Sequence, residues 1–204
     1  MKTHVIAMPS EADKKTVASL EREGFSPKVW GGFDNAWEHR TENFGWKLST
    51  NHTYDYDALG QDYKIGGKTV GIALGHWTLW KALEYMGGED YYHIMEADVK
   101  LREGWKPRLE QAMKDVPNDW DMIYAGNCCT QGVSERVKGE VYRSRPQCLH
   151  WYMVRRKALK TLIDTNQKAE SPIDIQLVLD SHPKLNVYAI LPRLADQHNT
   201  DLVP

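Results

Sequence analysis

Two carboxylates follow an apolar segment near the middle of this chain. Residues 91–95 form a predicted buried strand, and Glu96, Ala97 and Asp98 come directly after it. Ligands of open α/β sheets bind beyond the carboxyl ends of the strands, so acidic side chains here are well placed for chemistry. Their oxygens are the hard ligands that Mg²⁺ and Mn²⁺ prefer. The tripeptide therefore indicates a divalent-metal site with room for a diphosphate; a helix cap or a solvated turn is the structural alternative.

Strands and helices alternate along the chain, which is typical of an α/β protein. Apolar runs predict strands over residues 4–8, 28–30, 91–95, 122–125, 149–154 and 187–191, and amphipathic periods predict helices over 10–24, 68–87, 105–116, 156–163 and 173–179. Such alternation favours a mostly parallel sheet with helices on both faces. Residues 34–67 and 126–146 have no sustained period, and irregular segments of that length are usually functional or mobile.

The composition is that of one globular domain spanning residues 1–204. Apolar residues make up 41% and charged residues 26%, with eight Trp and ten Tyr, which excludes disordered, collagen-like and coiled-coil classes. A net charge of −2 gives no global electrostatic reason to bind nucleic acid or anionic lipid. Binding partners must therefore be inferred from individual sites.

The cysteines and the hydropathy bear on the compartment. Cys128, Cys129 and Cys148 match neither a paired disulfide framework nor a zinc-binding spacing, which favours a reducing cytosol. No apolar stretch approaches the roughly 18 residues of a membrane span. We expect a soluble, cytoplasmic protein without a transmembrane segment.

Several short motifs occur in an order and spacing that resemble glycosyltransferase family 25, which includes bacterial lipopolysaccharide sugar transferases and procollagen galactosyltransferases. The resemblance covers residues 71 to 201, with motifs at 71–80, 96–99, 119–123, 152, 172–174 and 192–197. The chain departs from the family pattern at Ile72, Gly75 and Ala97, where the family has Cys, Ser and the middle Asp of an acidic triplet. The outer carboxylates of the triplet remain, which leaves a Glu-x-Asp arrangement.

This resemblance implies a fold and a reaction. The family is similar to the GT-A class, a Rossmann-like α/β domain that binds a nucleotide-diphosphate sugar, here most readily a UDP-sugar, and transfers the sugar with inversion. By resemblance, Mn²⁺ or Mg²⁺ is held by Asp98, Glu96 and His198. The donor site would include His76, Glu96, Asp98 and Asp34.

The same resemblance assigns Asp174 as the general base, in a Pro-Ile-Asp motif at residues 172–174. Asp34 and Asp201 are the next candidates for that role. Each assignment has a structural alternative: Asp174 as a helix cap, His76 as a core histidine, and His198 as a surface residue beside a flexible tail.

The acceptor is the least defined part of the prediction. Trp37 and Trp46, in the first irregular segment, are placed to stack on a sugar or a base. Arg143 and Arg145 belong to a basic stretch at residues 133–160, which contains eight basic and two acidic residues. Such a stretch can follow a phosphorylated glycan or a nucleic-acid backbone, or can be a solvated face.

The expected acceptor is accordingly a hydroxyl on a glycan, such as a lipopolysaccharide core, or on a hydroxymethylated DNA base. Two other functions stay open. The departure at Ala97 favours a nucleotide-sugar-binding module with weak or no turnover, and a metal-dependent nucleotidyltransferase could use the same carboxylates.

Overall fold

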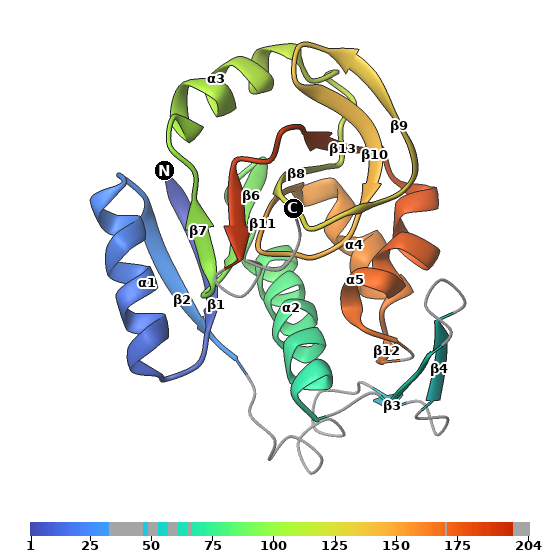
Figure 1. The fold of residues 1–204 in the computed structure, drawn as a ribbon. Coiled ribbons are helices and arrows are strands. Elements are labelled where there is room, and N and C mark those ends of the chain that lie inside the picture. The colour runs from blue at the N-terminus through green and yellow to red at the C-terminus, as the bar shows by residue number, and fades with distance from the viewer. Residues whose placement is uncertain (33–46, 49–52, 57–60, 65–66, 170, 198–204) are drawn as a thin grey trace.

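The computed structural model describes residues 1–32, 47–48, 53–56, 61–64, 67–169 and 171–197, and these residues form a layered α/β fold (Figure 1). The main sheet runs in the order β2 (Ser26–Gly31), β1 (Lys2–Ala7), β6 (Tyr91–Glu96), β11 (Trp151–Arg155), β8 (Met122–Gly126), β13 (Val187–Ile190), β10 (Val141–Pro146), β9 (Thr130–Lys138). Strands β2, β1 and β6 are parallel, as are β8 and β13. Strand β11 lies antiparallel between β6 and β8. The prediction of a mostly parallel sheet is confirmed.

Helices cover both faces of this sheet, also as predicted (Figure 1). Three helices pack on one face through a cluster containing Leu74, Trp77 and Leu159: α2 (Gly67–Met86), α4 (Arg156–Thr165) and α5 (Ile173–Gln176). Helix α5 continues as a π-helical segment over Leu177–Ser181. Helices α1 (Glu11–Arg22) and α3 (Trp105–Asp115) pack on the other face through Leu20 and Trp105. Apolar side chains that alternate along β6 supply both clusters, because successive strand residues point to opposite faces.

The first helix begins where the sequence predicts. Ser10 is the N-cap of α1, and its side-chain oxygen accepts a hydrogen bond from the backbone N–H of Asp13 at 3.1 Å. The Asp13 carboxylate in turn accepts from the backbone N–H of Met8 at 2.6 Å. This reciprocal capping fixes the turn between β1 and α1.

The expectation of an irregular segment over residues 126–146 is wrong, because β9 and β10 form a long antiparallel hairpin there. The turn contains Gly139, which has a φ of +54°. Along β10, Val141, Ser144 and Pro146 are buried whereas Arg143 and Arg145 are exposed. This spacing of buried and polar residues lacks the simple apolar alternation that marks a strand in sequence. The other irregular segment, residues 34–67, contains the short strands β3 (Lys47–Leu48), β4 (Thr53–Tyr56) and β5 (Gln61–Lys64), and β12 (Lys168–Ala169) pairs with β3.

The cysteine expectation is also wrong, since Cys128 and Cys148 form a disulfide. Their Cα atoms lie 5.6 Å apart and 20 residues separate them along the chain. The intervening β9–β10 hairpin returns the chain to its starting point, and this brings the two residues together. Cys129 is the free, exposed thiol among the described cysteines. In the part of the chain that the structure describes, no helix is both long and apolar enough to cross a bilayer.

Candidate functional site

The carboxyl ends of β1, β6 and β8 meet the start of β11 at one edge of the sheet. Because β11 is reversed, its first residue, Trp151, pairs with Met95 near the end of β6. The backbone N–H of Ala97 donates to the carbonyl of Ile6 at 3.0 Å, and the N–H of Glu96 donates to the carbonyl of His150 at 3.2 Å. The turn that carries Glu96 and Asp98 is therefore fixed by the strands on both of its sides.

Glu96 is held from below by a buried chain of hydrogen bonds. Its carboxylate lies 3.1 Å from His76 Nε2, and His76 Nδ1 lies 3.0 Å from the Tyr152 hydroxyl. Trp80 Nε1 donates to the same hydroxyl oxygen at 2.8 Å. A carboxylate only accepts, so Nε2 carries a proton, and Nδ1 of a neutral His76 accepts the proton of Tyr152. Burial raises the pKa of Tyr152 well above its ordinary value, so the phenol keeps that proton.

His76 is thus both a core residue and a hydrogen-bond partner of the Glu96 carboxylate. It is fully buried on α2, as the structural alternative expected, and its Nε2 contacts the Glu96 carboxylate. Trp77 and Trp80 pack in the core, with Trp80 also donating to Tyr152.

Gln197 brings Glu96 and Asp98 together from above. Its side-chain amide lies 3.3 Å from Glu96 Oε2 and 3.4 Å from Asp98 Oδ2. Gln197 ends the short strand β14 (Ala195–Gln197), which pairs with β7 (Val99–Leu101) and with the end of β8. Three-residue strands carry no periodic signal, so neither strand could be predicted, although Gln197 lies in the motif at residues 192–197.

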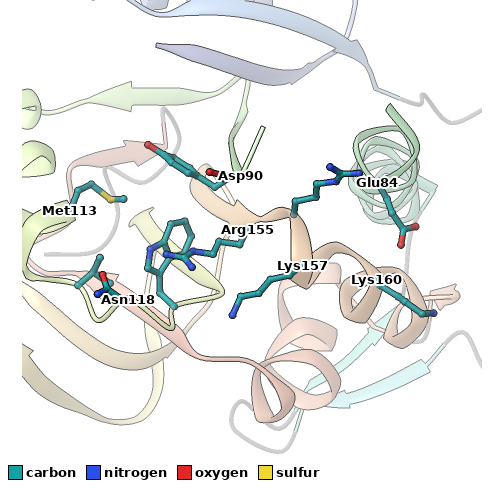
Figure 2. Close-up of a pocket in the computed structure, with 11 residues that line it drawn as sticks. Glu84, Asp90, Met113, Asn118, Arg155, Lys157 and Lys160 are labelled. Atoms are coloured by element: carbon teal, nitrogen blue, oxygen red, sulfur yellow. The ribbon is translucent and has the colours of Figure 1, made fainter. Parts of the chain in front are cut away.

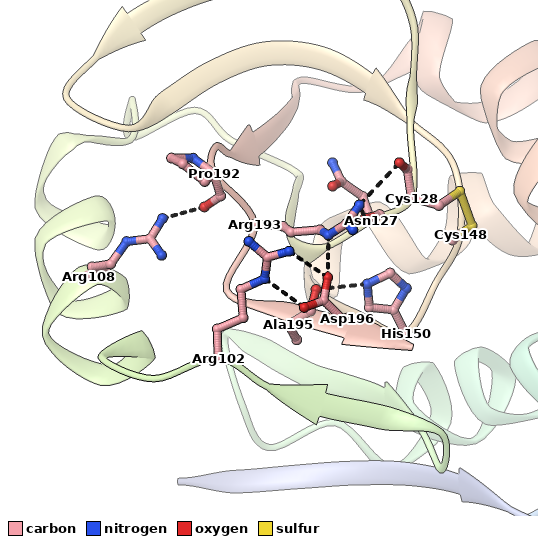
Figure 3. Close-up of polar contacts among 10 residues, drawn as sticks. All are labelled: Arg102, Arg108, Asn127, Cys128, Cys148, His150, Pro192, Arg193, Ala195 and Asp196. Carbon is pink, nitrogen blue, oxygen red and sulfur yellow. Dashed lines mark hydrogen bonds and ion pairs between the residues drawn. A yellow bond between two sulfur atoms is a disulfide. The ribbon is translucent and has the colours of Figure 1, made fainter. Parts of the chain in front are cut away.

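Strand β14 is anchored by an ionic cluster that surrounds Asp196 (Figure 3). Arg102 donates two hydrogen bonds to the Asp196 carboxylate, at 2.7 and 2.8 Å, and Arg193 donates a third from the opposite side. Hydrogen bonds from Arg102 hold the pKa of Asp196 below its usual range. Arg193 also reaches the backbone carbonyls of Asn127 and Cys128 beyond the end of β8. The cluster therefore fixes the strand that carries Gln197.

Close packing around His150 also holds strand β14 in place. His150 Nε2 lies 3.1 Å from the Ala195 carbonyl, and burial lowers the pKa of His150, so the neutral ring donates this bond. A Cβ at Gly126 would lie 2.4 Å from the His150 ring. Only glycine lets the end of β8 approach His150 this closely.

Asp174 lies in the first turn of α5, whose N-cap is Pro172. Its carboxylate accepts hydrogen bonds from the backbone N–H of Ile175 at 2.9 Å and of Cys148 at 3.1 Å. Cys148 adopts a φ of +64° and is joined by the disulfide to the segment that follows β8. Asp174 therefore satisfies an N–H in the first turn of α5, although Pro172 and not Asp174 is the N-cap, and it also ties α5 to the segment before β11.

The carboxylates of Asp174 and Glu96 belong to one electrostatic environment. Burial is the main cause that raises the pKa of Asp174, the negative charge of Glu96 raises it further, and the two backbone N–H groups oppose the shift. Burial raises the pKa of the core residue Tyr124 well above its ordinary value, and the charges of Asp174 and Glu96 raise it further. The two motifs that carry these carboxylates are far apart in sequence, and the fold brings them close enough for the charge of Glu96 to act on Asp174.

No family model matches the chain, and no curated protein matches it by sequence. Solved structures do match. One is a glycosyltransferase involved in the glycosylation of the major capsid of PBCV-1, with 12% identity, 98% of this chain and 93% of that chain covered, and a TM-score of 0.55. Another is A197 from STIV, with 12% identity, 95% and 82% coverage, and a TM-score of 0.50. The galactosyltransferase LgtC, in complex with donor and acceptor sugar analogs, matches at a TM-score of 0.46 and 14% identity, over 93% of this chain and 73% of that chain.

The chain has the GT-A glycosyltransferase fold. At 12% identity the likeness concerns the fold and does not extend to family 25 in particular. Within this fold, Glu96 and Asp98 lie at the carboxyl end of β6, the edge of the sheet at which ligands of α/β proteins bind.

The donor set around Glu96 fits a divalent metal. Two carboxylates within hydrogen-bonding distance of one Gln197 amide supply the hard oxygens that Mg²⁺ or Mn²⁺ prefers. Among the described residues, no group of three or more His, Cys, Asp or Glu side chains could hold a metal ion by itself. Mg²⁺ commonly completes such a two-carboxylate site with substrate phosphates and water.

Asp34, Trp37, Trp46, His198 and Asp201 fall outside the described residues. Arg143 and Arg145 lie on β10, where they line a separate pocket of about 600 Å³ with His182, and Arg143 extends over the ring of Tyr188. Glu96, Asp98 and Asp174 do not line that pocket.

Proposed function

We propose that this chain is a metal-dependent glycosyltransferase of the family 25 type. It would transfer a sugar from a nucleotide-diphosphate sugar, preferably a UDP-sugar, to an acceptor hydroxyl with inversion. The observation that carries this proposal is the convergence of Glu96, Asp98, Gln197 and Asp174 at the ligand-binding edge of a GT-A fold.

In this mechanism, Asp98 and Glu96 would hold Mn²⁺ or Mg²⁺, with His198 a further candidate ligand. When bound, the metal neutralises the charge that develops on the diphosphate leaving group. His76 and Gln197 hold the Glu96 carboxylate from opposite sides, which limits its reorientation when a donor enters. Asp34 remains a proposed donor-site residue.

Asp174 would act as the general base toward the acceptor hydroxyl. Burial and the charge of Glu96 raise its pKa, and a carboxylate with a raised pKa accepts a proton more readily. The N–H groups of Cys148 and Ile175 orient the carboxylate without supplying a competing proton acceptor. Inversion requires the base to lie on the face of the sugar opposite to the leaving group.

The departure from the family motif at Ala97 has a packing explanation. Ala97 is buried in the core cluster on the α1–α3 face of the sheet. In this chain, position 97 therefore supplies core packing, and Glu96 and Asp98 form the acidic pair at the site.

The acceptor is proposed to be a hydroxyl on a glycan, such as a lipopolysaccharide core, or on a hydroxymethylated DNA base. Trp37, Trp46, Arg143 and Arg145 stay candidate acceptor residues. A cytoplasmic place of action also stays a prediction, and the Cys128–Cys148 disulfide removes the cysteine pattern as support for it.

The decisive experiment incubates the protein with Mn²⁺ and several nucleotide sugars across a panel of glycans, peptides and hydroxymethylated DNA. We expect release of UDP together with a glycosylated product. Asp98→Asn should abolish both signals, whereas Asp180→Asn, the same change at an exposed position, should preserve them. Release of pyrophosphate would instead identify a nucleotidyltransferase. Nucleotide binding without turnover on any acceptor would identify a binding module.

A further inference from the structure

A second pocket lies at the edge of the sheet opposite to Glu96 and Asp98. It has a volume of about 880 Å³ and lies where β11 ends and α4 begins. Four cationic side chains line it and define the basic pocket: Arg155, Arg156, Lys157 and Lys160. Figure 2 shows Arg155 and Lys157 extending from this strand–helix junction, with Lys160 farther along α4.

Two of these cations have no ion-pair partner among the described residues. Lys157 pairs with Asp121 and Lys160 pairs with Asp164, each at 2.7 Å. Among the described residues, no carboxylate lies within ion-pair distance of the Arg155 or Arg156 guanidinium. Glu84 and Asp90 also line the pocket and are exposed, so the lining itself carries four cationic and two anionic side chains. The pocket therefore offers two unpaired guanidinium groups to an anion.

Arg155 is held in place before any ligand binds. Its guanidinium lies 4.6 Å from the centre of the Trp120 ring, and Trp120 is itself buried and in edge contact with Tyr91. The backbone N–H of Arg155 donates to the Asp121 carbonyl at 2.9 Å. A side chain that is already ordered loses less conformational entropy on binding. The planar donor set of a guanidinium also matches phosphate oxygens in pairs.

The positive charges at the start of α4 are unfavourable for the folded state and favour the binding of an anion. Helix α4 has no acidic residue in its first turn, and Arg155, Arg156 and Lys157 stand in succession at its positive end. Cations are unfavourable at that end of a helix because they repel the helix dipole. A bound anion would remove this repulsion.

We propose that the basic pocket binds a ligand that carries two or more phosphate groups. The site is distinct from the donor site, because Tyr91 and Glu96 lie at opposite ends of β6, about 17 Å apart at the usual rise of a strand. Its occupancy does not depend on glycosyl transfer.

The test measures binding of inorganic tripolyphosphate by calorimetry, at low ionic strength and with a chelator to exclude metal-mediated binding. We expect the combined variant Arg155→Gln and Arg156→Gln to weaken binding about tenfold or more. Lys106→Gln with Lys114→Gln, which removes two exposed cations from α3, should leave the affinity within about twofold. Asp98→Asn, at the donor site, should also leave it unchanged.

A stability measurement separates binding from a structural role. Removing the Arg156 charge should leave the melting temperature of the free protein unchanged or raise it. If Arg156 instead stabilised the fold, its removal would lower the melting temperature. Tighter binding of a single-stranded oligonucleotide than of tripolyphosphate would identify a phosphodiester polymer as the ligand source, and the reverse order a small phosphate ester. Absence of binding by both probes, or equal weakening in the α3 variant, would overturn the proposal.

Discussion

The hydroxyl of Tyr152 offers a sharp test of the hydrogen-bond chain beneath Glu96. Tyr152→Phe removes one oxygen and leaves the ring, so it should disturb the packing little. Two buried groups then lose their partner, Trp80 Nε1 and His76 Nδ1, and both side chains are fully buried. An unsatisfied buried polar group costs about 1–3 kcal/mol. We expect the free energy of unfolding to fall by about 3 kcal/mol, or the melting temperature by roughly 6–12 °C for a chain of this size.

Two other buried tyrosines provide matched controls. Among the described residues, the Tyr124 hydroxyl has one hydrogen-bond partner, His182 Nε2 at 2.9 Å, so Tyr124→Phe should cost about half as much. The Tyr92 hydroxyl donates over 3.4 Å to the Leu83 carbonyl, which also accepts the Gly87 N–H at 3.0 Å. Because that carbonyl keeps a partner, Tyr92→Phe should cost less than about 1 kcal/mol.

Urea denaturation of the three variants gives the comparison directly. The predicted order of destabilisation is Tyr152 first, Tyr124 second and Tyr92 last. If Tyr152→Phe destabilised the protein no more than Tyr92→Phe, the chain from Trp80 through Tyr152 to His76 would not contribute to the stability of the site.

Three further predictions concern chemistry and pH. Asp174→Asn should keep the fold and the nucleotide affinity but lower turnover by about 10²- to 10⁴-fold, measured with a working acceptor, and retention of more than about half the activity would place the base elsewhere. Asp98→Asn should abolish the rise in melting temperature that UDP with Mn²⁺ is expected to produce in the parent protein, whereas an undiminished rise would exclude Asp98 as a ligand of the metal. Burial lowers the pKa of His93 to about 4 and of His182 to about 3, from an ordinary value of 6.5. The folded state therefore binds fewer protons than the unfolded state below pH 6.5, and the free energy of unfolding should fall as pH decreases toward 4, by at most about 1.4 kcal/mol per pH unit for each histidine. Urea titrations at pH 7, 6 and 5 should show a shallower decline for His182→Gln, and an identical slope would contradict this assignment.

The buried elements of this fold could be predicted from sequence because each has a period of its own. Apolar runs identified β6 and β8, and Ser10 identified the start of α1. The placement of Glu96 and Asp98 at a ligand-binding edge followed from their position after a buried strand. The assignment of Asp174 as general base came only from the family resemblance, since residues 96 and 174 share no local pattern.

The elements that the sequence did not reveal depend on contacts between distant residues. The β9–β10 hairpin exposes Arg143 and Arg145 and has few apolar residues to mark it. Strands β7 and β14 are three residues long and are defined by their partners. The Cys128–Cys148 disulfide requires the hairpin between them, so the spacing of the cysteines alone could not predict it.

The reversed strand β11 has a consequence for communication across the molecule. Strand β11 begins beside the edge of the sheet that carries Glu96 and ends at Arg155, so one central strand connects that edge to the basic pocket. It is paired on both sides, and Trp151, Tyr152, Met153 and Val154 are completely buried. Such a strand belongs to the part of a protein whose amides exchange most slowly with solvent. The two ends should therefore behave as fixed points of one rigid unit, and a ligand at one end should leave the affinity at the other end unchanged.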